Sequence, residues 1–167
     1  DVDAPEQLKH VANHEARVLR HNLKHPKKLQ SVGQRPVPMA LFTTPQAASV
    51  GATEQALEAA QTPYVKAVHH FREVAYGWAL ETTSDHHFVK LLAAPTGQLL
   101  GAHIVGPQAE VLLQPLIQAM TFQLDAWTMA RDQYWPHPGL QEVVENALLK
   151  LDLPEPKKSR RWWGRSS

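Results

Sequence analysis

The chain has 167 residues, of which 43% are hydrophobic and 20% charged, and its formal net charge is +1. Such a composition is typical of a soluble globular domain and excludes wholesale disorder. The chain holds no cysteine, which excludes disulfides and a thiol nucleophile of its own, and it shows neither a bilayer-spanning stretch nor a signal peptide, so we expect a cytoplasmic protein without membrane contact.

The first predicted element is a helix from Pro5 to about His25, because apolar residues recur there at helical spacing. This apolar stripe consists of Leu8, Ala12, Ala16, Leu19 and Leu23. Pro26 ends the helix, since proline cannot continue the hydrogen-bond ladder. Residues 26–38 then contain three prolines and a glycine, the composition of a connector, and we place a domain boundary near residue 32.

Four histidines fall on one face of this predicted helix: His10, His14, His21 and His25. At about 100° per residue they lie within roughly 60° of one another, and the pairs four residues apart could chelate a divalent metal. Basic side chains crowd the same side, and no acidic residue completes a zinc-protease motif. We therefore interpret the face as a solvated polar surface and expect no metal site, with metal binding by the histidines as the alternative.

Beyond the connector the pattern favours strands that alternate with short helices. In chain order the predicted elements are strands at 39–43 and 47–50, a helix capped by Thr53, a strand at 64–71, a hairpin at 88–106, and helices at 108–124, 126–131 and 140–151. The hairpin is the clearest, because a Pro-Thr-Gly turn joins two β-rich runs. Pro115 should kink the longest of these helices. The order predicts an α+β fold, an antiparallel sheet with helices packed on one face, preceded by one separate helix.

The segment QYWPHPGLQE holds the best catalytic candidates, His137 and Glu142. Pro138 favours an extended backbone at His137, which places the imidazole in a rigid loop before a helix. Glu142 falls in the first turns of that helix and can reach back to the ring. A carboxylate that accepts one ring N–H fixes the tautomer and prepares the other nitrogen for proton transfer. The alternative is a plain loop histidine with Glu142 complementing the helix dipole.

The charge of the chain is uneven along its length. Five basic residues fall in the last 11 positions: Lys157, Lys158, Arg160, Arg161 and Arg165. Without these five charges the remainder carries −4 instead of the overall +1, so we expect no nucleic-acid partner. We expect residues 152–167 to form a disordered basic tail, with contact to phosphates or a membrane surface as the alternative.

Several separated segments resemble one family, the pyridine nucleotide-disulfide oxidoreductases. VPMALFTTPQAASVGATE (37–54), VKLLAAPTGQLLGAHIVGPQAEVL (89–112) and HPGLQE (137–142) resemble its C-terminal dimerisation (interface) domain. DVDAPEQLKHVANHEARV (1–18) is similar to the end of its FAD-binding domain. The resemblance implies a remnant of that FAD-binding domain at 1–31, a dimerisation domain at 32–151, and a homodimer held by the helix at 108–124 and the hairpin.

The same resemblance implies roles for individual residues. Asp1 would bind the ribityl chain of FAD, and the helix start at Leu8, Lys9, His10, Val11 and Ala12 would point at the flavin ring. Pro138 would approach the flavin of the partner subunit, while Tyr134 and Trp135 would line the substrate mouth or simply pack at an interface. NADPH would reduce FAD, and FAD a cysteine pair. His137, oriented by Glu142, would then serve the partner's active site as acid and base.

Within the family, LKHVANHEARV, QYWPHP and EVVENALL resemble the mycothione reductases more than glutathione reductase or lipoamide dehydrogenase. The implied substrate is a low-molecular-weight disulfide, mycothione. Because the nucleotide-binding parts and the cysteine pair are missing, we expect a C-terminal piece of such an enzyme that has no reductase activity alone and retains no FAD. The alternatives are another member of the family, lipoamide dehydrogenase- or glutathione reductase-like, and a self-association module without a catalytic role.

Overall fold

The computed structural model describes residues 7–155. They divide into two compact units, one that ends at Val37 and one that begins at Pro38. The predicted boundary at 31–32 lies within the connector of the first unit, and the predicted domain limits stay predictions. Asp1 and the basic part of the tail lie outside the described residues.

The first unit consists of helix α1 (Lys9–Lys24) and the connector. Three side chains of α1 bind the backbone of the connector. These contacts are His14 Nε2 to Val32 O at 2.9 Å, His21 Nε2 to Lys28 O at 2.9 Å, and the Asn22 amide to both N and O of Gln30 at 2.7 and 2.9 Å. The polar face of α1 was expected to meet only solvent, but half of its histidines fasten the chain segment that follows the helix.

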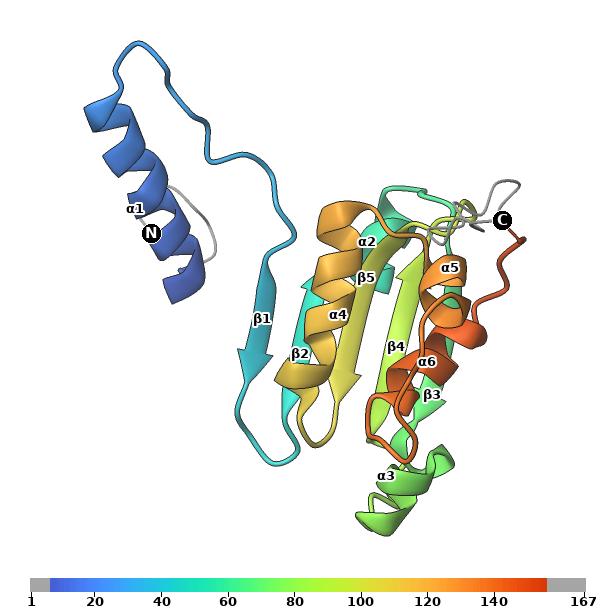
Figure 1. Cartoon of the computed structure of the whole chain (residues 1–167). Helices are drawn as coiled ribbons and strands as arrows, with labels where there is room; N and C mark the ends of the chain where they lie inside the picture. Colours follow the sequence, from blue (N-terminus) through green and yellow to red (C-terminus); the bar gives the residue numbers. More distant parts are fainter. Residues whose placement is uncertain (1–6, 156–167) are drawn as a thin grey trace, which may run out of the picture. The chain divides into compact units, whose positions relative to one another are not determined.

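The second unit is built on a five-stranded antiparallel sheet with the order β1-β2-β5-β4-β3 (Figure 1). The strands are β1 (Pro38–Leu41), β2 (Ala47–Gly51), β3 (Val65–His70), β4 (Phe88–Ala93) and β5 (Leu99–Val105). Strands β4 and β5 form the predicted hairpin, and Gly97 in its turn has a φ of +93°, which suits glycine. The predicted fold class is confirmed.

Three helices cover one face of the sheet (Figure 1). They are α4 (Ala109–Phe122), α5 (Ala126–Arg131) and α6 (Glu142–Leu149). The short α2 (Glu54–Ala59) binds side chains on the other face, since Glu54 contacts Lys66 and Lys90. α4 continues as one helix through Pro115, where the sequence predicts a kink.

The core lies between the sheet and these three helices. Strand residues of the inner face pair across the sheet in the row Ala67, Leu91, Ala102 and Val50. All four are buried, as are the inward residues of α4 and α6. Gly101 allows close approach of two segments, because a Cβ there would lie 2.1 Å from the carbonyl oxygen of Ala52.

One segment has no counterpart among the predicted elements. After β3 the chain forms a short 3-10 helix, η1 (Phe71–Glu73), and a short helix, α3 (Ala75–Ala79), before it enters β4. Phe71 is completely buried, and its backbone N–H donates a hydrogen bond to the carbonyl of His87. The segment therefore forms a fixed rim at the end of the sheet where β3 finishes.

Candidate active-site dyad and its surroundings

His137 and Glu142 form the pair that the sequence predicts. Nδ1 of His137 donates to Oε1 of Glu142 over 2.7 Å, and the other carboxylate oxygen accepts the backbone N–H of Gly139 at 3.0 Å. The His137 side chain is 69% exposed, whereas that of Glu142 is only 15% exposed. The geometry presents an oriented imidazole to the surface on a largely covered carboxylate.

The carboxylate of Glu142 is stabilised as an anion. The Gly139 N–H is the main cause that lowers the pKa of Glu142 below its ordinary value, and His137 lowers it further. Burial raises the pKa of Glu145, one turn along α6, and the Glu142 charge adds to that effect. Glu142 is therefore ionised at neutral pH and available to hold the ring N–H.

Side-chain hydrogen bonds to the backbone fasten the loop before α6. The His137–Pro138 peptide bond is cis, and the side-chain amide of Gln141 donates to the carbonyl of Pro136 at 3.0 Å. Trp135 is partly buried and its indole N–H donates to Ala130 O at 3.3 Å, which agrees with the packing alternative for this residue. Tyr134 is fully exposed. The predicted substrate residues thus have different surroundings.

A groove lies beside Pro138, between the loop and the η1–α3 segment. Its volume is about 530 Å³, and Tyr76 and Trp78 are among its lining residues. Trp78 is 72% exposed, which is unusual for so large an aromatic side chain. The sequence offered a weak signal for it, two aromatic residues in the stretch between two predicted strands.

The predicted flavin-facing residues lie at the start of α1. Leu8 is the N-cap and provides no side-chain hydrogen bond, and the first turn contains no acidic residue. Lys9, His10, Val11 and Ala12 form that turn. Helix N–H groups that lack a side-chain cap, at the positive end of the dipole, are suited to bind an anionic or electron-rich group.

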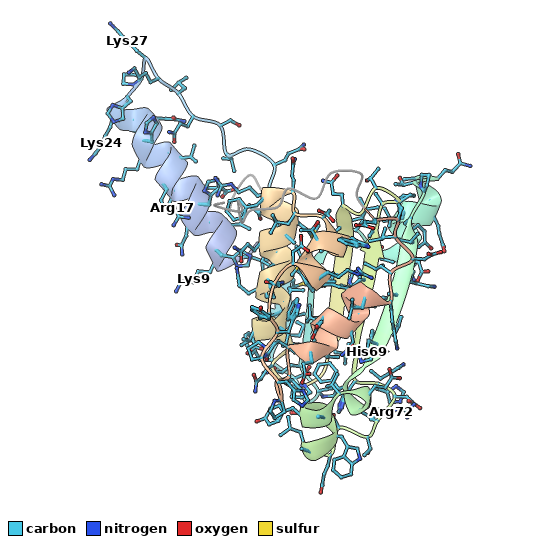
Figure 2. All side chains as sticks on the ribbon, turned by 45° about the vertical axis from the view of Figure 1, so that its right-hand side comes forward. Lys9, Arg17, Lys24, Lys27, His69 and Arg72 are labelled. Carbon is cyan, nitrogen blue, oxygen red and sulfur yellow. The ribbon has the colours of Figure 1, made fainter. Side chains whose placement is uncertain are left out.

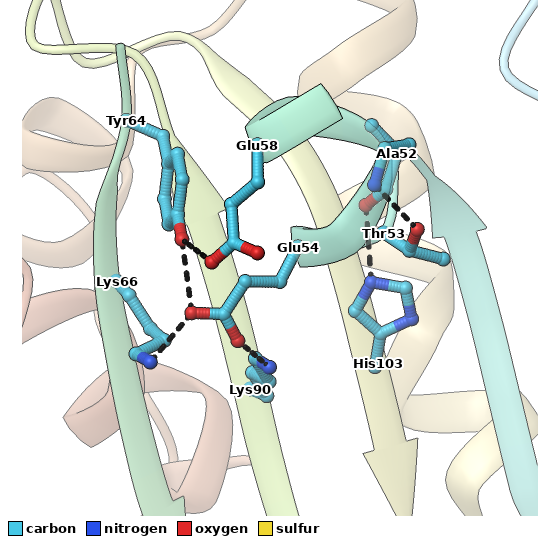
Figure 3. Close-up of polar contacts among 9 residues, drawn as sticks. Ala52, Thr53, Glu54, Glu58, Tyr64, Lys66, Lys90 and His103 are labelled. Atoms are coloured by element: carbon cyan, nitrogen blue, oxygen red, sulfur yellow. Dashed lines mark hydrogen bonds and ion pairs between the residues drawn. The ribbon is translucent and has the colours of Figure 1, made fainter. Parts of the chain in front are cut away.

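A second polar cluster, which the sequence does not predict, joins α2 to the outer face of the sheet (Figure 3). Glu54 accepts hydrogen bonds from Lys66 at 2.5 Å, from Lys90, and from the hydroxyl of Tyr64 at 3.0 Å. The two lysines are the main reason that the pKa of Glu54 falls to about 2. Burial and the neighbouring carboxylates raise the pKa of Tyr64 to about 12. Glu54 thus contacts two positive charges from the sheet, so the cluster fastens α2 to the sheet.

Within residues 7–155, no three or more histidine or acidic side chains stand close enough together to hold a metal ion. The ring centroids of His21 and His25 lie 4.7 Å apart, but Nε2 of His21 is hydrogen-bonded to the connector at Lys28 O. Over the same residues no helix is both long and apolar enough to cross a membrane.

Residues 37–148 match the family described as pyridine nucleotide-disulphide oxidoreductase, dimerisation domain. The chain belongs to this family. The match spans the sheet and its helices, including His137 and Glu142, and it confirms the resemblance drawn from the sequence motifs.

Two individual relatives are similar to this chain over most of its length. The chain is 53% identical to the mycothione reductase of Mycobacterium tuberculosis over 156 residues, which make up 90% of this chain and 34% of that protein. It is 31% identical to the dihydrolipoyl dehydrogenase of Chlamydia trachomatis over 156 residues, 92% of this chain and 32% of that protein. The chain therefore spans about a third of the length of these relatives.

A solved structure supports the fold. The HOCl-induced flavoprotein disulfide reductase RclA from Escherichia coli superposes with a TM-score of 0.77 at 19% identity, covering 90% of this chain and 34% of that one. At this identity the likeness concerns the fold alone.

Proposed function

We propose that this chain forms the C-terminal, dimerising part of an NADPH- and FAD-dependent disulfide reductase of the mycothione reductase type, and that it works in the cytoplasm. We further propose that His137 and Glu142 act as an acid–base dyad in the active site of the partner subunit. The observation that carries the proposal is the 2.7 Å contact between an exposed imidazole and a largely covered carboxylate in a chain of this family.

The chemistry assigned to the dyad is proton transfer. When a thiolate attacks the substrate disulfide, a new S–S bond forms and the other sulfur leaves with the electron pair of the broken bond. His137, charged and held through Nδ1 by Glu142, gives that sulfur a proton from Nε2. Glu142 stabilises the imidazolium before the transfer and keeps the tautomer that can take up a proton afterwards. The cysteines come from outside this chain, which has none.

A bound FAD would supply the electrons. The uncapped first turn of α1, from Leu8 to Ala12, fits such a group because the N–H groups ahead of Ala12, which itself donates to Leu8 O, and the helix dipole favour an electron-rich ring. We assign Asp1 to the ribityl chain and Pro138 to the approach of the partner's flavin. Tyr134 and Trp135, together with the groove beside Pro138, are assigned to the substrate.

A chimaera tests the catalytic part of the proposal. The chain would be joined behind the N-terminal two thirds of the M. tuberculosis mycothione reductase, and NADPH oxidation measured with mycothione, glutathione disulfide and lipoamide. His137→Ala should lower kcat/KM for mycothione by about 10²- to 10⁴-fold. The control His86→Ala, which removes an exposed loop histidine, should leave the rate unchanged. Full activity of His137→Ala would contradict the catalytic role, and a preference for lipoamide the mycothione assignment.

Mixed dimers test whether the dyad acts across the interface. One chimaera lacks the cysteine pair and the other carries His137→Ala, so each is inactive as a homodimer. If the dyad serves the partner, coexpression restores activity because one site in each mixed dimer is complete. Absence of any recovery in purified mixed dimers would place the dyad in its own subunit. The 167-residue chain alone should elute without flavin absorbance and without reductase activity.

A further inference from the structure

Three charged or titratable side chains meet at the far end of helix α6. Lys150, just after the helix, lies 2.9 Å from Oε2 of Glu73 in η1, and it also approaches the carbonyl of Val68 at 3.5 Å. Nδ1 of His69, the next residue of β3, lies 3.0 Å from the same carboxylate oxygen but makes no hydrogen bond with it. His69 is only 5% exposed, and it lies where the sheet meets the η1–α3 segment, close to Arg72 (Figure 2). One carboxylate therefore joins α6 to the rim of the sheet.

The electrostatics support this role of Glu73. Its hydrogen bond with Lys150 is the main cause that lowers the pKa of Glu73. Burial lowers the pKa of His69, and Lys150 lowers it further, so this ring is neutral at neutral pH. Glu73 then faces one positive charge and one neutral ring, and its contact with Lys150 is the charged one.

The helix that carries Lys150 at one end carries Glu142 at the other. Between them, Val143, Val144, Ala147 and Leu148 are buried against the core. Apolar burial holds a helix on a sheet but is not directional, so it does not by itself fix the position of the helix along its axis. A charge-assisted contact at one end does.

We propose that Glu73 and Lys150 form a positioning clamp that fixes α6 and thereby the placement of Glu142 and His137. Glu73 also lines the groove beside Pro138, so the clamp connects the end of α6 with the surface next to the dyad loop. The role in catalysis rests on the proposed function. The placement of Glu142 does not, and it can be measured without any reaction.

The first test follows the titration of the Glu142 carboxyl carbon by NMR in the 167-residue chain. Removing a nearby negative charge should, by electrostatics alone, lower the pKa of Glu142. Glu73→Gln also breaks the clamp and loosens the Gly139 and His137 contacts, so we expect the Glu142 pKa to rise instead, by up to about 0.7. An unchanged or lower value overturns the proposal.

Further variants separate geometry from charge. Lys150→Met should raise the Glu142 pKa in high salt, where direct electrostatics over the length of α6 is screened, and Lys150→Arg should not. The exchange Glu73→Lys with Lys150→Glu should restore the wild-type titration, because it rebuilds the contact with reversed charges. If Glu73→Gln does not fold, the two Lys150 variants provide the test. The same Glu142 pKa in Lys150→Met and Lys150→Arg would overturn the clamp.

The second test uses the chimaera. Lys150→Met should reduce kcat by up to about fivefold, the factor that matches the usual contribution of a half-exposed ion pair, with KM for NADPH unchanged. Lys150→Arg should keep kcat. A fall in kcat equal for both variants contradicts the clamp. If His137→Ala is fully active, the proposed function is wrong. The Glu142 pKa measurements still test the clamp, because they do not depend on the reaction.

Discussion

Glu54 holds its negative charge between two lysines and a tyrosine hydroxyl, at the point where α2 meets the sheet. Its partners come from β4 and from the start of β3, and Lys90 is 36 residues away in sequence. The folded chain therefore prefers the ionised form of this side chain, and the pKa of about 2 expresses that preference.

The consequence is a stability that depends on acid pH. A lowered carboxyl pKa stabilises the fold above the ordinary value of 4.5, and the stabilisation is lost as the pH falls from there to about 2. Glu54→Gln should thus be less stable than the wild type at pH 7, and the two should converge as the pH falls through this range. Thermal unfolding at several pH values measures the difference.

Glu58 provides the matched control on the same helix. It accepts from Tyr64 at 3.1 Å and makes no lysine contact among the hydrogen bonds of the described region. Glu58→Gln should follow the wild type closely at every pH. If both variants lose the same stability at pH 7, the negative charge on the helix, and not the lysine contacts, causes the loss.

Sequence alone predicted some residues and missed others for a physical reason. His137 and Glu142 are five residues apart, so the local chain path brings them together and their spacing could be recognised. The Glu54 cluster and the Glu73–Lys150 contact join segments far apart in the chain, and only the folded sheet brings them together. The contact of His14 with Val32 depends likewise on how the connector turns back.

Among the elements, the start of α2 could be predicted from a local sequence signal. Thr53 was predicted as its cap, and Thr53 Oγ1 accepts the backbone N–H of Ala56 at 3.2 Å. The η1–α3 segment carries no such cap signal, because Tyr76 and Trp78 are separated by Gly77, a poor helix former, and the segment is held by buried Phe71. The hairpin, in contrast, contains both of its strands and its turn within one stretch, 88–106.

The cap of α2 should be measurable. Thr53→Ala should lower the free energy of unfolding by about 1 kcal/mol, since one N–H at the helix start loses its acceptor. Thr53→Ser keeps the hydroxyl and should retain most of the stability. Denaturant unfolding compares the variants. If Thr53→Val is as stable as Thr53→Ser, the role of the hydroxyl is contradicted.

At the scale of the whole molecule, the outer side of α4 is the surface that we expect to pair. Its exposed positions are Val111, Gln114, Gln118, Thr121 and Phe122. None of these carries a charge, and Val111 and Phe122 are 58% and 67% exposed. An uncharged, partly apolar stripe on a helix of a dimerisation domain fits a symmetric contact with a second copy.

Val111→Asp tests this expectation. In a two-fold symmetric contact one substitution places two like charges near each other, so the dimer dissociation constant should rise about a hundredfold or more. Sedimentation of the 167-residue chain at micromolar concentration measures it. Thr83→Asp, at an exposed loop position, is the control and should not change the association. A wild-type chain that is monomeric in this range would contradict the expected interface.

The exposure of His137 has one more consequence. With 69% of its side chain exposed, the ring is open to solvent over most of its surface. If the dyad transfers protons as proposed, the loop and α6 orient the ring but do not select the acceptor. Selectivity would then have to come from a surface that covers the ring, and a change in that surface would alter the choice of substrate without altering the dyad.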